Sequence, residues 1–309
     1  MSDFKLNILG CGSASPTPFR NPSSQVLEYR GRLMMIDCGE GTQAMMRRMK
    51  LHFSRLTHIF ISHMHGDHCL GLPGLLSTLA LNGKTGTVTV VLPREGVEIM
   101  RSIINYFCRE APFEIVFQPI EGAGGEVLNL PGLTVTAFPL YHRVPAYGFI
   151  FKEKPKQLHL RGDMVKFLQI PIAQLPKIKD GADFVKPDGE VIPNSRITTP
   201  ASPSVSYAYC SDTMFDKRVA ECVKGVDFLY HEATYDSSFA TKANSRGHST
   251  AAEAGAIAAM AGVKTLIIGH FSKRYVNVDI LVEDARQNFP NVIAAYDGLT
   301  IDLASNGHE

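Results

Sequence analysis

The stretch His58-Ile-Phe-Ile-Ser-His-Met-His-Gly-Asp-His68 joins an apolar run directly to a dense group of potential metal ligands. Residues 58–62 predict a short buried strand, and a helix is expected to follow the stretch. The potential ligands are His63, His65, Asp67 and His68. Neutral imidazoles and carboxylates are the ligands that zinc takes in catalytic sites. The stretch therefore predicts a metal centre at the junction of a strand and a helix.

Further ligands are expected downstream, because one hexapeptide cannot fill the coordination spheres of two metal ions. His142 ends an apolar β-run over residues 133–141, Asp212 follows the run 205–210, and His270 ends the run 264–269. Folds of the α/β class place site residues at such strand ends. The same placement recurs three times, so we expect these side chains to join the metal centre.

Strand-like and helical segments follow one another in both halves of the chain. Strands are also expected at residues 4–9, 25–30, 33–38, 87–92, 114–118, 146–151, 226–231 and 292–296. Helices are expected at 41–50, 69–81, 95–108, 213–223, 249–261 and 279–288. Thr250 and Glu253 have the spacing of a capping box. From this pattern alone, a four-layer sandwich of two sheets and an ordinary α/β sheet fit equally well.

Residues 152–203 differ from the rest of the chain in being rich in Pro, Lys and Gly and only weakly periodic. A long structureless segment inside a compact domain is usually functional or disordered. Residues 152–186 carry eight basic side chains against four acidic ones, a charge that suits contacts with a phosphate backbone. We expect residues 1–309 to form a single domain with a flexible inserted arm over about 152–203.

The overall composition is that of a globular protein, with 45% hydrophobic and 20% charged residues. Lys and Arg total 31 and Asp and Glu total 30, which excludes a uniformly basic nucleic-acid-coating protein but allows a local basic patch. The six cysteines include no C-x-x-C pair, so reduced thiols in the cytoplasm are expected. Neither a secretory signal nor an apolar run long enough for a membrane span is present, so a cytoplasmic protein with no membrane association is expected.

The H-x-H-x-D-H motif with its spaced His, Asp and His resembles the metallo-β-lactamase superfamily. Four further motifs are Asp37-Cys-Gly-Glu-Gly-Thr-Gln43, His231-Glu-Ala-Thr234, His248-Ser-Thr250 and Gly269-His-Phe-Ser-Lys-Arg-Tyr275. Together they resemble short-form ribonuclease Z, a family of zinc phosphodiesterases that cut the 3′ trailer from precursor tRNA. The resemblance extends from Leu6 to about Ile301. It implies an αββα sandwich with the metals at the sheet edges, and a homodimer.

The same resemblance implies a ligand set for two zinc ions per chain. The first ion would take His63, His65 and His142, the second Asp67, His68 and His270, and Asp212 would bridge the two. Manganese or iron can occupy similar His and Asp sites.

Catalytic roles follow from the chemistry that phosphodiester hydrolysis needs. Asp67 would orient the attacking water as ligand and general base. His248 precedes the N-terminus of a helix, which favours anions, and would donate a proton to the leaving oxygen while Glu232 orients its ring. Arg274 would bind a substrate phosphate, and Asp37 would orient the metal-binding histidines.

Two segments depart from the family pattern. The family's P-x-K-x-R-N loop is here Pro16-Thr-Pro-Phe-Arg-Asn21, in which Pro18 replaces the lysine. Arg20 and Asn21 remain as candidate residues of the loop near the acceptor end, where the family selects the cut position and rejects mature CCA ends. The arm over 152–186 lacks the family's Gly-Pro element.

Two other functions compete with tRNA 3′ processing. Another hydrolase of the superfamily, such as a glyoxalase II-like thioesterase or a small-molecule phosphodiesterase, would share the metal motif but not the motifs that begin at His231 and His248. A metal-free RNA-binding scaffold should have lost ligands, whereas all the expected ligand positions are occupied here.

Overall fold

The computed structural model describes residues 4–306, which divide into two compact units. Unit 1 contains the residues before 130, residues 134–151 and the residues after 204. Unit 2 contains residues 130–133 and 152–204. Among the described helices, none combines the length and the apolar character that a membrane span requires.

The first sheet of unit 1 has seven strands in the order β18-β1-β2-β3-β4-β5-β6. Neighbours from β18 to β3 pair antiparallel, and neighbours from β3 to β6 pair parallel. The strands are β1 (Phe4–Gly10), β2 (Ser24–Tyr29), β3 (Arg32–Cys38), β4 (Leu56–Phe60), β5 (Thr87–Pro93), β6 (Glu114–Ile120) and β18 (Thr300–Asp302). The parallel part brings the carboxyl ends of β3 and β4 to one edge, where the H-x-H-x-D-H stretch begins.

The second sheet also has seven strands, in the order β17-β16-β15-β14-β9-β8-β7. Its parallel part runs from β14 to β17, and β7 and β8 form an antiparallel pair. The strands are β7 (Gly125–Asn129), β8 (Leu133–Leu140), β9 (Ala146–Glu153), β14 (Ser206–Cys210), β15 (Phe228–Glu232), β16 (Thr265–Gly269) and β17 (Val292–Ala294).

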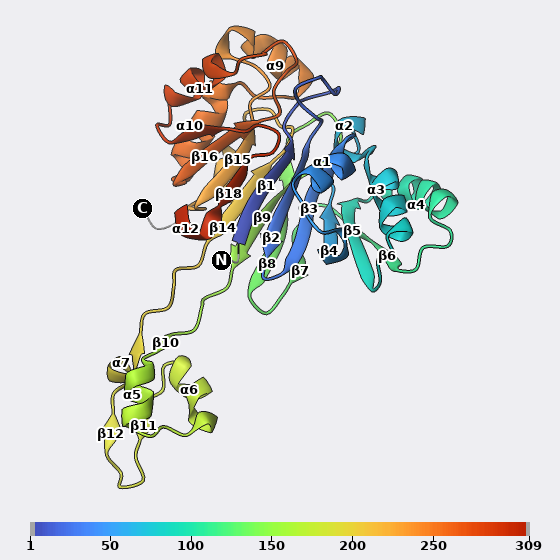
Figure 1. Ribbon diagram of the computed structural model, residues 1–309. Coiled ribbons are helices and arrows are strands. Elements are labelled where there is room, and N and C mark those ends of the chain that lie inside the picture. Colours follow the sequence, from blue (N-terminus) through green and yellow to red (C-terminus); the bar gives the residue numbers. More distant parts are fainter. Residues whose placement is uncertain (1–3, 307–309) are drawn as a thin grey trace. The chain divides into compact units, whose positions relative to one another are not determined.

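Helices cover the outer faces of both sheets (Figure 1). Beside the first sheet lie α1 (Thr42–Arg48), α2 (Gly66–Cys69), α3 (Leu72–Leu81) and α4 (Gly96–Phe107). The second sheet is accompanied by α8 (Lys217–Cys222), α9 (Ala240–Arg246), α10 (Ala251–Ala261) and α11 (Asp279–Arg286), and the short α12 (Leu303–Asn306) contacts β1.

The sheets face each other through aromatic side chains, since the ring centroid of Phe60 lies 5.4 Å from that of Phe149 and 5.3 Å from that of Phe151. Unit 1 is therefore a four-layer αββα sandwich, which confirms the expected fold class.

The helix expected at about 69–81 is present as α3 but begins at Leu72, after the short α2 has ended at Cys69. The backbone of Gly71 lies so close to Gly39 that a Cβ atom would sit 2.1 Å from the Gly39 carbonyl oxygen. Pro73 is the second residue of α3, and its missing N–H costs nothing in the first turn of a helix. Strands β7 and β18 were not expected. The expected capping box at the start of α10 is confirmed by reciprocal hydrogen bonds between Thr250 and Glu253.

Unit 2 corrects the expectation of a structureless segment. It contains β10 (His159–Leu160), α5 (Gly162–Phe167), α6 (Leu175–Lys179), β11 (Phe184–Val185), β12 (Val191–Ile192), α7 (Asn194–Ile197) and β13 (Thr198–Thr199). Its buried core consists of Ile170, Ile178, Phe184, Ile192 and Ile197. Each element is too short to show a hydrophobic period, and the apolar residues are separated by Pro, Lys and Gly along the chain. The core therefore forms only when the tertiary structure brings them together.

Candidate active site

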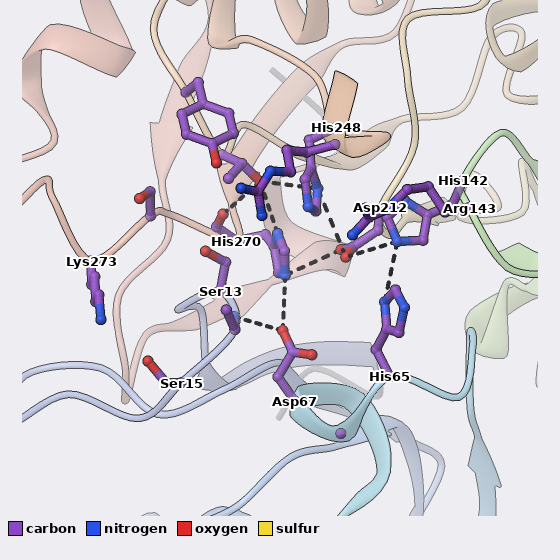
Figure 2. Close-up of a pocket in the computed structure, with 16 residues that line it drawn as sticks. Ser13, Ser15, His65, Asp67, His142, Arg143, Asp212, His248, His270 and Lys273 are labelled. Carbon is purple, nitrogen blue, oxygen red and sulfur yellow. Dashed lines mark hydrogen bonds and ion pairs between the residues drawn. The ribbon is translucent and has the colours of Figure 1, made fainter. Parts of the chain in front are cut away.

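The predicted metal ligands meet in one cluster of unit 1, at the carboxyl ends of strands from both sheets. Figure 2 shows His65, Asp67, His142, Asp212 and His270 at the cavity that they line. His63 and His65 follow β4, and Asp67 and His68 lie in α2. His142 follows β8, Asp212 follows β14 and His270 follows β16. Residues more than 200 positions apart in the sequence thus contribute side chains to the same cluster.

The first group of ligand atoms comes from three histidines. His65 Nδ1 lies 3.0 Å from His63 Nε2 and 3.2 Å from His142 Nε2. Asp212 Oδ2 lies 3.6 Å from His63 Nε2 and 3.8 Å from His142 Nε2. Burial lowers the pKa of His63 well below its ordinary value, which favours the neutral imidazole that a metal ion needs.

The second group lies on the other side of Asp212. His68 Nε2 and His270 Nε2 are 3.3 Å apart, and Asp67 Oδ2 lies 3.6 Å and 3.5 Å from them. Asp212 Oδ1 lies 3.4 Å from His68 Nε2 and 3.1 Å from His270 Nε2. Each oxygen of Asp212 therefore faces a different group.

This donor set fits a pair of divalent metal ions. Asp212 Oδ1 is buried and accepts no hydrogen bond from the described residues. Leaving a buried carboxylate oxygen without a hydrogen bond is costly, and a bound cation would satisfy it. Several imidazole nitrogens also point at one another rather than at proton donors of the protein.

A surrounding set of hydrogen bonds orients the histidine rings. Asp37 Oδ2 accepts a hydrogen bond from His68 Nδ1 at 2.8 Å, and Asp37 Oδ1 accepts one from the Ser62 N–H at 2.7 Å. His142 Nδ1 donates to the Gly247 carbonyl at 2.6 Å. These contacts leave the Nε2 atoms of His68 and His142 for the cluster.

Two residues of the site have left-handed backbones although they are not glycine, namely Asp37 with φ 55° and His270 with φ 59°. Such conformations cost about 1–3 kcal/mol and persist where the surroundings hold them. Both residues are held here by hydrogen bonds, including one of 3.0 Å between His270 Nδ1 and Thr234 Oγ1.

His248 and Glu232 form a hydrogen-bonded pair beside the cluster. His248 Nδ1 donates to Glu232 Oε1 at 2.9 Å, and the buried Glu232 also accepts from the Thr213 N–H and the Thr234 hydroxyl. Burial lowers the pKa of His248, but the charges of Glu232 and Asp212 outweigh burial and raise it to about 9. His248 lines the cavity, so the structure places an imidazole with a raised pKa beside the predicted ligand cluster.

The cavity itself has a volume of about 420 Å³ and a basic rim that the sequence analysis missed. Arg143, Arg246 and Lys273 line it together with the cluster. These cations could have been predicted from their positions in the sequence next to site residues. Arg143 follows a predicted ligand, and Arg246 lies two residues before His248.

Arg274 occupies a different environment from its neighbour Lys273. Its guanidinium carbon lies 4.2 Å from the ring centroid of Phe239, and its Nε donates to the Ser272 hydroxyl at 3.3 Å. The structure therefore stacks Arg274 on an aromatic ring and turns Lys273 toward the cavity. The phosphate contact of Arg274 stays a prediction.

Arg20 and Asn21 are engaged with the protein itself. The Arg20 guanidinium donates to the carbonyls of Tyr275 and Val276, and the Asn21 N–H donates to Asp297 Oδ2 at 2.7 Å. These contacts anchor the loop that follows β1, whose Ala14 N–H donates to Asp67 Oδ2 at 2.7 Å. Arg20 and Asn21 thus hold the loop that reaches a predicted metal ligand.

Comparisons with known proteins show the family of this chain. Ribonuclease Z of Parabacteroides distasonis is 47% identical over 304 residues, which cover 98% of this chain and 100% of that protein. Ribonuclease Z of Porphyromonas gingivalis is 47% identical over 305 residues, with the same coverage. A family model described as anti-Pycsar protein Apyc1 matches residues 4–175.

Solved structures give the same assignment. The crystal structure of human tRNase Z, short form, is 25% identical and has a TM-score of 0.70, covering 97% of this chain and 99% of that one. The metallo-beta-lactamase fold protein YhfI from Bacillus subtilis is 17% identical with a TM-score of 0.68, covering 96% and 98%, and shows the fold alone. The chain thus matches the Apyc1 model over residues 4–175, and over nearly its whole length it belongs to the ribonuclease Z family of endoribonucleases.

Proposed function

We propose that this chain removes the 3′ trailer of precursor tRNA by hydrolysing one phosphodiester bond, leaving a 3′-hydroxyl on the tRNA. The observation that carries the proposal is the combination, in one cavity, of a dinuclear ligand cluster and the hydrogen-bonded pair of His248 and Glu232. Family membership supports the choice of RNA as substrate.

Two zinc ions are the proposed cofactors, and manganese or iron would be accepted by the same ligand types. His63, His65 and His142 would hold one ion, Asp67, His68 and His270 the other, and Asp212 would be shared. Divalent metal ions in such a site supply positive charge to phosphate oxygens and make water more acidic.

Asp67 is the proposed general base. Its Oδ2 atom is fixed by the Ala14 N–H at 2.7 Å, which leaves the other carboxylate oxygen to accept a proton from the attacking water. Because Ala14 belongs to the loop after β1, this contact also couples the position of the loop to that of the base.

His248 is the proposed general acid. Its Nδ1 atom is occupied by Glu232, so Nε2 remains to donate a proton to the departing ribose 3′ oxygen. Glu232 is itself held by three hydrogen bonds from Thr213 and Thr234, which keep the imidazole ring in one orientation.

We further propose that the enzyme acts in the cytoplasm, as a homodimer, and binds precursor tRNA through unit 2 as well as through the active site. Unit 2 carries most of the basic side chains of the 152–186 segment on its surface. Such a surface provides contacts with phosphates that lie far from the cleaved bond.

Removing unit 2 should separate tRNA binding from chemistry. The Ser204 hydroxyl donates to the Lys154 carbonyl at 2.9 Å, so a short Gly-Ser linker can replace residues 155–203. We expect KM for precursor tRNA to rise about tenfold and its salt dependence to flatten, since each lost phosphate contact lowers the salt slope by somewhat less than one. Hydrolysis of bis-p-nitrophenyl phosphate should stay unchanged, because that substrate needs only the cavity.

A matched control keeps the fold of unit 2 and removes only charge. Lys177→Gln with Lys179→Gln on α6 leaves the buried Ile178 in place. This variant should show a smaller shift in the same direction. A linker variant that processes tRNA with the wild-type KM across a salt series would contradict the role of unit 2.

The proposed function is tested by mapping product ends. Precursor tRNAs with and without an encoded CCA are incubated with the purified protein, and both product ends are sequenced. We expect a tRNA with a 3′-hydroxyl, a trailer with a 5′-phosphate, and loss of cleavage after chelation of divalent metals. Hydrolysis of bis-p-nitrophenyl phosphate without cleavage of tRNA would instead assign the chain to another hydrolase class of the superfamily.

A further inference from the structure

Three cationic side chains at the mouth of the active-site cavity have no role in the proposed chemistry. Arg143, Arg246 and Lys273 are exposed and line the cavity. Within residues 4–306 none of the three forms an ion pair or a side-chain hydrogen bond. Cations without a protein partner beside a phosphodiesterase site are available for substrate phosphates.

Arg143 and Arg246 each adjoin one end of a hydrogen bond between a side chain and a backbone carbonyl. His142 Nδ1 donates to the Gly247 carbonyl at 2.6 Å, so the residues on either side of this hydrogen bond are also close. A Cβ atom on Gly247 would lie 3.3 Å from Arg143 Cγ and 2.8 Å from His142 Nδ1, and Gly247 has φ 77°. The stem of Arg143 therefore packs against the turn that joins Arg246 to His248.

Lys273 belongs to another wall of the cavity. The preceding segment pairs with the loop after β1, since the Phe271 N–H donates to the Cys11 carbonyl at 2.9 Å and the Ser13 N–H donates to the Phe271 carbonyl at 3.1 Å. Figure 2 shows Lys273 and Arg143 on opposite sides of His270 and Asp212. Lys273 thus lies with the loop that contacts Asp67, and the arginine pair lies with His248.

The proposed chemistry indicates which part of the substrate lies against each wall of the cavity. In the proposed hydrolysis, a bond forms between the water oxygen and phosphorus while the bond from phosphorus to the ribose 3′ oxygen breaks. The water proton passes to Asp67, and a proton from His248 passes to the 3′ oxygen, which stays on the tRNA. The last tRNA nucleotide must therefore lie on the His248 side of the cavity.

We propose that Arg143 and Arg246 together bind the phosphate that precedes the last tRNA nucleotide, and that Lys273 faces the first phosphate within the trailer. This assignment rests on the proposed function. A guanidinium presents paired N–H donors that match two phosphate oxygens, so two arginines suit a phosphate whose position must be exact. A lysine is a mobile point charge and suits a trailer of variable sequence.

The test combines protein variants with neutral linkages in the substrate. A methylphosphonate replaces the phosphate before the last tRNA nucleotide, and kcat/KM is measured for wild type, Arg143→Gln and Arg246→Gln. We expect the neutral linkage to cost wild type about tenfold, on the scale of charged hydrogen bonds. In each arginine variant the same linkage should cost less than about threefold, because one of the two arginine contacts is already lost.

Two controls locate the effect. A methylphosphonate at the first trailer phosphate should reduce kcat/KM of both arginine variants as much as that of wild type. The same substrate should reduce kcat/KM of Lys273→Gln only slightly, because that variant already lacks the proposed lysine contact. Arg101→Gln changes an exposed arginine that pairs with Glu98 on α4, outside the cavity, and should behave as wild type with every substrate.

The assignment would be overturned if the methylphosphonate before the last tRNA nucleotide reduced kcat/KM of both arginine variants as much as that of wild type. It would also be overturned if the arginine variants were insensitive only to the methylphosphonate at the trailer phosphate. These outcomes are distinct from failure of the proposed function, in which wild type would not cleave the unmodified precursor at all.

Discussion

Replacing Asp212 by alanine is expected to abolish phosphodiester hydrolysis, with a loss of at least about 10³-fold in kcat. The two oxygens of this buried carboxylate face both ligand groups, and Oδ1 accepts no hydrogen bond from the described residues. Among residues 4–306, Asp212 is therefore the predicted ligand whose loss would affect both proposed metal ions at once. The fold should persist, because the substitution removes a carboxylate from a polar cluster of histidines and leaves the apolar packing of the two sheets in place.

The measurement compares metal content, circular dichroism and turnover on precursor tRNA and on bis-p-nitrophenyl phosphate. Asp216→Ala is a matched control, since Asp216 is a nearby carboxylate that caps α8 by accepting from the Arg218 N–H at 2.8 Å. It should lose about 1 kcal/mol of stability and keep its metal and its activity. An Asp212→Ala protein that retains two metal ions per chain and near-normal turnover would show that Asp212 does not bridge them.

The second large effect is expected for His248→Ala, which should lower turnover on precursor tRNA by about 10²-fold or more, the usual scale for a general acid. His248 is held by Glu232 rather than counted among the predicted metal ligands, so metal content should not change. A substrate with a good leaving group needs less help from a proton donor. The loss should therefore be smaller on bis-p-nitrophenyl phosphate.

His52→Ala provides a surface control, because His52 is an exposed histidine that does not line the cavity. It should match wild type on both substrates. Equal losses for His248→Ala on good and poor leaving groups would argue that His248 positions the substrate instead of donating a proton. Loss of metal from His248→Ala would instead indicate that it serves as a ligand.

Much of the metal cluster could be predicted because its signals are local in sequence. The H-x-H-x-D-H stretch follows an apolar run, and His142, Asp212 and His270 each end or follow another. Parallel strands bring their carboxyl ends to one edge of a sheet, so strand-end residues of separate segments converge. The capping box at Thr250 could also be predicted from the sequence, because its two hydrogen bonds join residues three positions apart.

The choice between one sheet and two could not be made from hydrophobic periodicity, since buried strands of either architecture have the same pattern. The structure shows two sheets, because contacts between distant segments join one sheet to the other. Phe60 packs against Phe149, and the Tyr207 hydroxyl donates a hydrogen bond to Gln25. The helices and strands of unit 2 were missed for a related reason, although an inserted segment was expected over about 152–203. Its core residues are isolated along the chain, and its elements are too short to carry a period.

The residue types of the site were determined by the sequence, and their orientation was decided by the tertiary structure. Lys273 and Arg274 are adjacent cations, yet one faces the cavity and the other stacks on Phe239. Arg143 and Arg246 are more than 100 positions apart, yet both line the cavity, and Arg143 packs against Gly247, which follows Arg246. A side chain's direction depends on the backbone at its own position and on what packs against it, and both are set by segments that lie far away in the sequence.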